Sequence, residues 1–292
     1  MNSNIIKLSS SDISSKEISN VNKILKNQFL GMGKMVFNFE KKLESFFGSH
    51  VACTVNGTAA LHLALQAAGV KRNDEVLVPS ITYVASLQAI TATGARPVIC
   101  DVNINDGLIS LKDATKRLSK KTKAIMPVYF AGYSGDINKI YNFASKNKLK
   151  VIEDAAHAFG SKYNRKKIGS TGDFVCFSFD GIKNITSGEG GCVVSKNKKI
   201  INRIKDLRLL GVKRDSIKRY KGDKSWIYKV EEQGWRYHMS DIMASIGLVQ
   251  LNRFNELSKK RKNLAKYYDF LLKKIDWVET VRFNVGEVVP HI

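Results

Sequence analysis

The sequence is short of residues that crosslink a chain or anchor it in a membrane. It has 4 cysteines and 4 prolines in 292 residues, and no apolar run reaches the roughly 18 residues that a membrane span needs. The N-terminus lacks the basic-then-apolar pattern of a secretory signal. The cysteines are isolated, each in a strand-like apolar segment: Cys53, Cys100, Cys176 and Cys192. Because no CxxC pair occurs, we expect buried free thiols in a reducing cytoplasm, with no disulfide or metal site. Because neither a signal pattern nor a long apolar run occurs, we expect no membrane partner.

Acidic residues are also scarce relative to basic ones. The chain has 26 Asp and Glu against 48 Lys and Arg, which gives a formal net charge of +22. Such a charge would suit a nucleic-acid-binding protein. The basic residues are spread along the sequence, however, and no zinc spacing or aromatic-basic motif accompanies them. We therefore favour a general lysine bias and expect no nucleic-acid partner, although the positive field would attract a small substrate that carries phosphate.

Strand-like and helix-like segments alternate along much of the chain, which is typical of the α/β class. Helices are expected over residues 10–28 and 36–47, the first of them capped within residues 10–12. A long helix pair across residues 240–275 then leads into a last expected strand at residues 277–283. A chain of this length can form one large domain and a smaller one.

Residues 174–194 form the most informative stretch, FVCFSFDGIKNITSGEGGCVV. Two apolar segments bracket a Gly-rich turn, which predicts two strands joined by a loop. The loop carries Lys183 where the rigid scaffold ends. Packed backbone there would desolvate the ammonium group, lower its pKa and make the amine a nucleophile towards carbonyl groups. The alternative is an ordinary solvated lysine at the surface.

A second stretch, LKVIEDAAHAFG, runs an apolar strand into Glu153 and Asp154. A carboxylate at the end of a buried strand is costly unless a cation or hydrogen bonds compensate it. Strand alternation places the two carboxyl groups on opposite faces, so we expect Asp154 to face a ligand and Glu153 to be structural. His157 follows and is either a ligand contact or a satisfied structural histidine.

A third stretch begins with the short apolar segment VACTV, which is followed by Asn56, Gly57 and Thr58 and then by a helical pattern. The first N–H groups of a helix have no intrahelical acceptor and attract anions, so this turn predicts a phosphate site. The alternative is an ordinary N-cap at Thr58. Tyr83 follows a later strand at the edge where ligands of α/β sheets gather, and its ring either stacks on a planar ligand or packs in the core.

Six stretches, in order along the chain, resemble the DegT/StrS-type family of nucleotide-sugar aminotransferases, which depend on pyridoxal 5′-phosphate (PLP) and have fold type I: GMGKMVFNFEKKLESFFG, NGTAALHLAL, VPSITYVAS, VIEDAAHAFG, SFDGIKNITSGEGG and, with changes, GWRYHMSDIMASIGLVQL. The resemblance implies a mixed, mostly parallel sheet flanked by helices. It also implies a large PLP-binding domain at residues 1–250, with helices within residues 10–48 lining its entrance. Residues 251–292 would start a small C-terminal domain that is incomplete relative to the family.

The resemblance implies a role for each candidate residue. Lys183 would bind the cofactor and carry a proton during catalysis, Asp154 would keep the pyridine nitrogen charged, and His157 would lie near the ring or its 3-hydroxyl group. Further cofactor contacts are implied at Gly57, Thr58 and Ser178 (phosphate) and at Tyr83 (ring stacking). Substrate contacts are implied at Met32, at Tyr129, where the family often has His, and at Arg236 and His238, which replace a family Asn and Arg. Relatives donate that Asn across a dimer.

The resemblance further implies a homodimer with shared active sites. Such an enzyme moves an amino group, with glutamate as the expected donor, onto a keto group of a nucleotide-linked deoxysugar for lipopolysaccharide, O-antigen or another surface glycan. Related dehydratases carry His in place of the lysine, so the presence of Lys183 disfavours their chemistry. A catalytically impaired member with a regulatory or binding role is the alternative, because GWRYHM departs from the family pattern and the expected small domain is incomplete.

Overall fold

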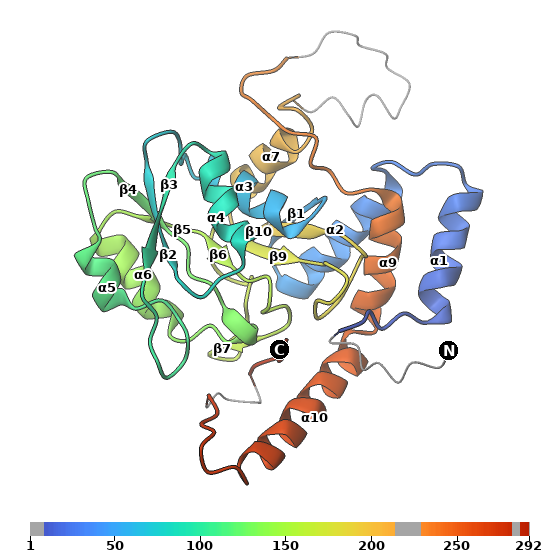
Figure 1. Cartoon of the computed structure of the whole chain (residues 1–292). Helices are drawn as coiled ribbons and strands as arrows, with labels where there is room; N and C mark the ends of the chain where they lie inside the picture. The colour runs from blue at the N-terminus through green and yellow to red at the C-terminus, as the bar shows by residue number, and fades with distance from the viewer. Residues whose placement is uncertain (1–8, 214–228, 282–286, 292) are drawn as a thin grey trace, which may run out of the picture.

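The computed structural model describes residues 9–213, 229–281 and 287–291, and Figure 1 shows their strands flanked by helices. The helices are α1 (Ser15–Lys26), α2 (Lys34–Phe47), α3 (Gly57–Ala67), α4 (Val84–Ala92), α5 (Leu111–Lys116), α6 (Ile137–Lys146), α7 (Lys198–Leu207), α9 (Asp241–Asn252) and α10 (Phe254–Leu272), with a short 3-10 helix at Phe130–Gly132. The strands are β1 (His50–Thr54), β2 (Glu75–Pro79), β3 (Arg96–Cys100), β4 (Thr122–Ile125), β5 (Lys150–Val151), β6 (Glu153–Asp154), β7 (Lys162–Tyr163), β8 (Lys166–Lys167), β9 (Val175–Ser178) and β10 (Gly191–Ser195).

Two four-stranded sheets continue into one another through the stretch that holds β5 and β6. One has the order β3-β2-β4-β5 and is parallel throughout. The other has the order β1-β10-β9-β6, in which β6 and β9 are parallel while β9, β10 and β1 pair antiparallel. A bridge between Val128 and Asp154 continues the pairing across the junction. The predicted mixed, mostly parallel sheet is confirmed.

Alternate side chains of the central strands pack against helices on opposite faces. Phe177 of β9 lies in the same apolar cluster as Leu43 of α2. Its neighbour Cys176 lies in a second cluster, which Leu63 of α3 and Ile204 of α7 help to form. Successive residues of a strand point to opposite faces, so continuous apolar runs such as the one in β9 require cover on both sides.

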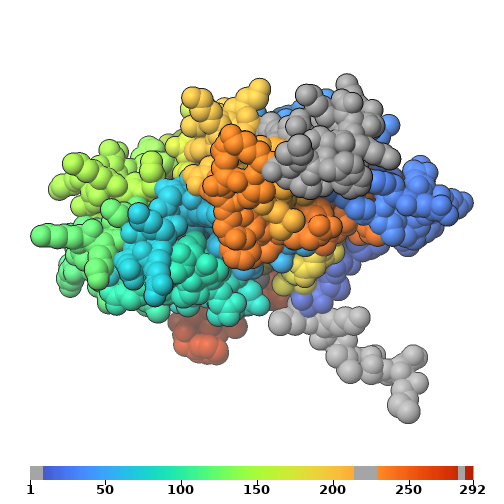
Figure 2. Space-filling model, turned by 90° about the horizontal axis from the view of Figure 1, so that it is seen from above, coloured from blue at the N-terminus to red at the C-terminus, as the bar shows by residue number. Residues whose placement is uncertain are grey.

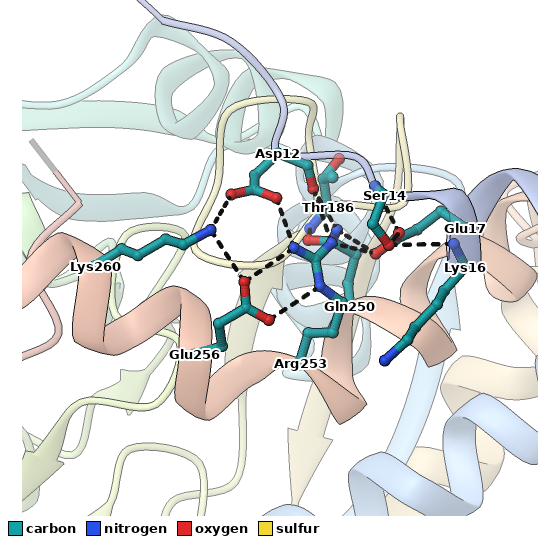
Figure 3. Close-up of polar contacts among 9 residues, drawn as sticks. All are labelled: Asp12, Ser14, Lys16, Glu17, Thr186, Gln250, Arg253, Glu256 and Lys260. Atoms are coloured by element: carbon teal, nitrogen blue, oxygen red, sulfur yellow. Dashed lines mark hydrogen bonds and ion pairs between the residues drawn. The ribbon is translucent and has the colours of Figure 1, made fainter.

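A polar cluster ties the N-terminal segment to the junction of α9 and α10 (Figure 3). Arg253 donates to Glu17 Oε1 from Nη1 at 2.8 Å and to Asp12 Oδ1 from Nη2 at 2.7 Å. Gln250 Nε2 donates to the same Glu17 oxygen at 2.8 Å, and Gln250 Oε1 accepts from the backbone N–H of Thr186 at 3.4 Å. The cluster therefore links the start of the described chain to the Gly-rich loop between β9 and β10.

Two expectations about the ends of the chain were wrong. The cap of α1 is Ser14, which forms a capping box with Glu17, and not a residue of 10–12. Residues 277–281 form no strand, and the remainder of the expected strand at 277–283 lies outside the described residues.

Figure 2 shows the N-terminal helices (blue) at one end of the molecule and the region of α5 and α6 (green) at the other. The division into domains at residue 250 stays a prediction.

Candidate active site

A cavity of about 700 Å³ opens where the carboxyl ends of β2, β6 and β9 meet the start of α3. Strand ends and helix N-termini converge at this edge of an α/β sheet, which is why ligands bind there. All seven residues predicted to contact a cofactor line the cavity: Gly57, Thr58, Tyr83, Asp154, His157, Ser178 and Lys183. The fold thus brings together three sequence stretches that were singled out separately.

The start of α3 forms one wall of the cavity. Asn56 caps this helix, because its side chain accepts from the backbone N–H of Ala59 at 2.8 Å. The alternative interpretation of Thr58 as the N-cap is therefore wrong. The N–H groups of Gly57 and Thr58 come first in the helix, where no intrahelical acceptor exists and the helix dipole is positive. A Cβ atom at Gly57 would lie 2.9 Å from Ser178 Cβ, so glycine is needed for this close approach.

Asp154 lies at the carboxyl end of β6 and is buried. Ser86 Oγ donates to its Oδ2 at 2.6 Å, and the backbone N–H of Ala156 donates to its Oδ1 at 3.2 Å. Burial raises the pKa of Asp154, and the hydrogen bonds and the charge of Lys183 offset only part of this effect. A cationic N–H group in the cavity would supply the missing compensation.

Lys183 is half-buried in the loop that follows β9. Burial lowers the pKa of its amine, while the carboxylates of Asp180 and Asp154 act in the opposite direction. Desolvation of this kind raises the share of neutral, nucleophilic amine at neutral pH. The Nζ atom lies 3.4 Å from Nε2 of His291, a residue from the far end of the chain.

His157 lies in the loop after β6 and is a neutral imidazole at pH 7. Burial is the main cause that lowers its pKa to about 4, and the charge of Lys183 adds to the effect. Its Nδ1 faces the backbone N–H of Ala131 at 3.4 Å and is therefore the acceptor nitrogen. In the neutral ring the proton is then on Nε2, which leaves that atom as a hydrogen-bond donor.

The residues predicted to contact substrate are placed differently. Tyr129 is 1% exposed and its hydroxyl group donates to Glu153 Oε2 at 2.7 Å, so it belongs to the core and its predicted position at the substrate is corrected. The preceding strand, β4, ends at Ile125, and Val128, which forms an isolated bridge with Asp154 next to Tyr129, does line the cavity. Within the described part of this one chain, Met32, Arg236 and His238 are also absent from the cavity wall. Their roles at the substrate stay predictions.

Sequence reasoning missed several residues of the site. Ser86 holds Asp154 but lies 68 positions before it, in the first turn of α4. Asp180, three residues before Lys183, also lines the cavity, and its charge opposes the lowering of the Lys183 pKa by burial. His291 lies 108 positions after Lys183 and has no distinctive local motif. Only the short spacing between Asp180 and Lys183 offered a signal, since the other contacts depend on the fold.

The sequence matches the family model of the DegT/DnrJ/EryC1/StrS aminotransferase family over residues 11–291. It is 39% identical over 237 residues to the GDP-perosamine synthase of Vibrio cholerae, covering 81% of this chain and 62% of the synthase. The structure resembles the sugar aminotransferase CalS13 of Micromonospora echinospora (TM-score 0.87, 31% identity, 96% of this chain and 77% of that one). It also resembles the PLP form of Spr1654 from Streptococcus pneumoniae (TM-score 0.85, 30% identity, 98% and 76%). The chain spans about two thirds of the length of the curated relatives it matches.

Together with the cavity, these likenesses define a PLP-dependent transferase of fold type I. The chain belongs to the DegT/DnrJ/EryC1/StrS family of PLP-dependent sugar aminotransferases. Its cavity fits the cofactor: the first N–H groups of α3 suit a phosphate, Gly57 leaves the backbone open to close approach, and Asp154 needs a cationic partner of the kind a protonated pyridine nitrogen provides. Lys183 supplies the amine in the same cavity.

Other features of the described residues complete the picture of the chain. The four cysteines are buried free thiols, as predicted. In the described ranges, no helix combines the length and apolar character that crossing a bilayer requires. The same ranges hold no group of three or more His, Cys, Asp or Glu side chains placed to bind a metal ion.

Proposed function

We propose that this protein transfers an amino group from glutamate to a keto group of a nucleotide-linked deoxysugar used for lipopolysaccharide, O-antigen or another surface glycan. The observation that carries the proposal is the convergence of Lys183, Asp154 and the start of α3 on one cavity. Curated relatives support the substrate class, because they include a GDP-perosamine synthase. The net charge of +22 also favours a substrate that carries phosphate.

Each side chain has a defined task in this reaction. When bound, PLP supplies an electron sink for the negative charge that develops on the donor carbon. Asp154 holds the ring nitrogen in its charged form, and Ser86 fixes the orientation of that carboxyl group. Lys183 binds the cofactor through Nζ and, once free, moves the proton at the donor carbon. His157 offers an Nε2–H donor within the same cavity.

We further propose a cytoplasmic homodimer in which Met32, Arg236 and His238 of one protomer complete the site of the other. Large apolar side chains are exposed on and between α1 and α2: Ile18, Leu25, Phe29, Leu30 and Phe37. Their burial against a second copy would remove an unfavourable exposed surface. The buried free thiols agree with a reducing compartment.

Mass spectrometry with a panel of nucleotide-linked ketosugars tests the proposal. The PLP-loaded protein is incubated with glutamate and each sugar, and the expected product has the mass of the corresponding amino sugar. Lys183→Ala is the matched control and should yield none. Absence of any amino sugar, with every panel member tested against a protein that holds PLP, would overturn the assigned substrate class.

The visible band of the bound cofactor tests the alternative of an impaired or regulatory member. An active aminotransferase loses this band when glutamate is added, whereas a binding protein with the same fold keeps it. The alternative is not favoured, since each predicted cofactor-contacting residue lines the cavity. An unchanged band at saturating glutamate would reverse that preference.

A further inference from the structure

Residues 287–291, which come after α10 in the sequence, pack against the active-site cavity. The backbone of Lys162 donates to the carbonyl of Glu287 at 2.7 Å, and the backbone of Val289 donates to Ser161 Oγ at 2.9 Å. Gly132, with φ of +95°, has no space for a side chain, because a Cβ atom there would lie 2.5 Å from the Val289 carbonyl oxygen. The seat for this segment is therefore built into the fold.

The same segment is tied to the backbone on both sides of Lys183. Arg261 of α10 donates to the His291 carbonyl from Nη1 at 3.1 Å, and from Nη2 to the carbonyls of Ile182 at 3.0 Å and Lys183 at 3.1 Å. Asn184 donates to the Val289 carbonyl at 3.2 Å. One guanidinium group and one amide thus hold the lysine loop and the segment in a common frame.

The imidazole of His291 lies inside the cavity wall. It is 8% exposed and its ring centroid is 4.2 Å from that of His157. Burial is the main cause that lowers the pKa of His291 to about 2, and His157, Lys183 and Arg261 add to the effect. The ring is therefore neutral at physiological pH, with Nε2 at 3.4 Å from Lys183 Nζ, at the long end of hydrogen-bond distances.

We propose that His291 is a positioning residue for Lys183. The Lys183 amine donates a hydrogen bond to Nε2 of His291, and this bond holds the amine towards the cofactor site. A neutral imidazole with so low a pKa does not take the proton itself. The carboxyl groups of the cavity are Asp154, Asp180 and Glu189, the first two of which act to raise the pKa of the Lys183 amine. The basic groups near it are the cation Arg261, which acts to lower this pKa, and the imidazoles of His157 and His291. His291 is the member of this set that offers Nζ a neutral acceptor at bonding distance.

The inference rests on cofactor binding by Lys183 and not on the identity of the sugar. Its readout is the rate at which the PLP-free protein captures added PLP at Lys183, trapped with borohydride and quantified by peptide mass spectrometry across pH. At high pH, where the amine is neutral in every variant, the plateau rate reports position alone. The midpoint of the pH profile reports how far the acceptor stabilises the ammonium form.

Two substitutions separate the acceptor from the bulk of the ring. We expect His291→Phe, which fills the space without an acceptor, to lower the plateau rate about tenfold, equivalent to the loss of one hydrogen bond. The midpoint should also move to lower pH, because the ammonium form loses its partner. His291→Gln keeps an acceptor and should stay within about threefold of the wild type. Should His291→Phe not fold, as judged by circular dichroism, His291→Asn takes its place, since its shorter amide withdraws the acceptor from Nζ.

Glu287→Gln is the matched control on the same segment. Glu287 Oε1 accepts from the backbone of Arg165, and a Gln side chain can still do so, which leaves His291 in its place. This variant should capture PLP as the wild type does. Equal losses in His291→Gln and His291→Phe, or no loss in either, would overturn the proposal. Failure of the sugar panel alone would leave it standing, because the capture of PLP needs no sugar.

Discussion

The two faces of β6 carry neighbouring carboxyl groups with opposite surroundings. Glu153 is 2% exposed and Asp154 is 6% exposed, so both are buried. Glu153 accepts from the hydroxyl groups of Tyr129 at 2.7 Å and Tyr141 at 2.5 Å, inside the core. Asp154 has one side-chain donor, Ser86, and faces the cavity.

The contrast shows that burial of a carboxyl group does not by itself mark a functional site. Burial raises the pKa of both groups. The hydroxyl groups of the two tyrosines occupy both oxygens of Glu153 in the core, and Glu153 does not line the cavity, so its role is structural. Around Asp154 the environment opens towards Lys183 and the start of α3, which leaves space for a cationic ligand. The useful distinction is therefore which side of the strand each carboxyl group faces.

Replacing each carboxyl group by its amide should give the largest difference in activity between the two faces of β6. Asp154→Asn removes the charge that we propose holds the pyridine nitrogen, and we expect amino transfer to fall by about a thousandfold. Glu153→Gln, the matched control, should retain activity within about threefold. Steady-state kinetics with glutamate measure both. Similar losses in the two variants would show that the faces are not functionally different.

The dependence of stability on pH tests the environment of Glu153, on the face of β6 that packs in the core. Burial raises the pKa of Glu153 to about 7, although the two tyrosine hydroxyl groups oppose the shift. The folded chain then keeps a proton that the unfolded chain releases near pH 4.5, so the free energy of unfolding decreases as pH rises from about 4.5 to about 7. We expect a decrease of up to about 3 kcal/mol in urea denaturation. Glu153→Gln should remove it, and the difference between the two curves excludes the contribution of Asp154; parallel curves would refute this assignment.

Removal of one tyrosine hydroxyl group tests how much its hydrogen bond to Glu153 contributes to stability. Tyr141→Phe leaves Glu153 with one donor fewer in the core, and we expect the free energy of unfolding to fall by about 2 kcal/mol while activity is unchanged. Tyr163→Phe is the control, because Tyr163 donates to the exposed Asp136 and its loss should cost about 0.5 kcal/mol. Equal costs for the two variants would mean that burial of Glu153 adds nothing.

A methyl group added at Gly57 tests the cavity side of the comparison, where Asp154 lies, and has the smallest expected effect. At Gly57 a Cβ atom would meet Ser178 at 2.9 Å, so Gly57→Ala must displace β9 or the start of α3. We expect PLP to bind about tenfold more weakly in a spectroscopic titration. Gly31→Ala, where an added Cβ meets nothing within 4 Å, should bind PLP normally. Normal binding by Gly57→Ala would show that this approach is not needed.

The parts of the site that are local in sequence could be predicted, and the parts that depend on distant pairing could not. Asp154 ends a strand with a recognisable apolar pattern, Lys183 lies in the loop after another, and strand alternation assigned Glu153 to the other face. The prediction for Tyr129 was wrong because its hydroxyl group donates a hydrogen bond to Glu153, 24 positions away, in the core. His291 was missed because only the folded chain brings residues 287–291 beside the lysine loop.

The same limit applies to the fold. The two strands around Lys183 were predicted and pair antiparallel as β9 and β10. The helix pair across residues 240–275 was predicted and appears as α9 and α10. The expected strand at residues 277–283 was wrong over its described part, since an alternating pattern forms a strand only where a partner edge is present.

A crystal structure of the protein loaded with PLP tests the central claim most directly. We predict cofactor density continuous with Lys183 Nζ, with the ring nitrogen at hydrogen-bond distance from Asp154 and the phosphate at the backbone N–H groups of Gly57 and Thr58. A cofactor bound elsewhere, or one that places its ring nitrogen away from Asp154, would contradict the assignment of the two faces of β6.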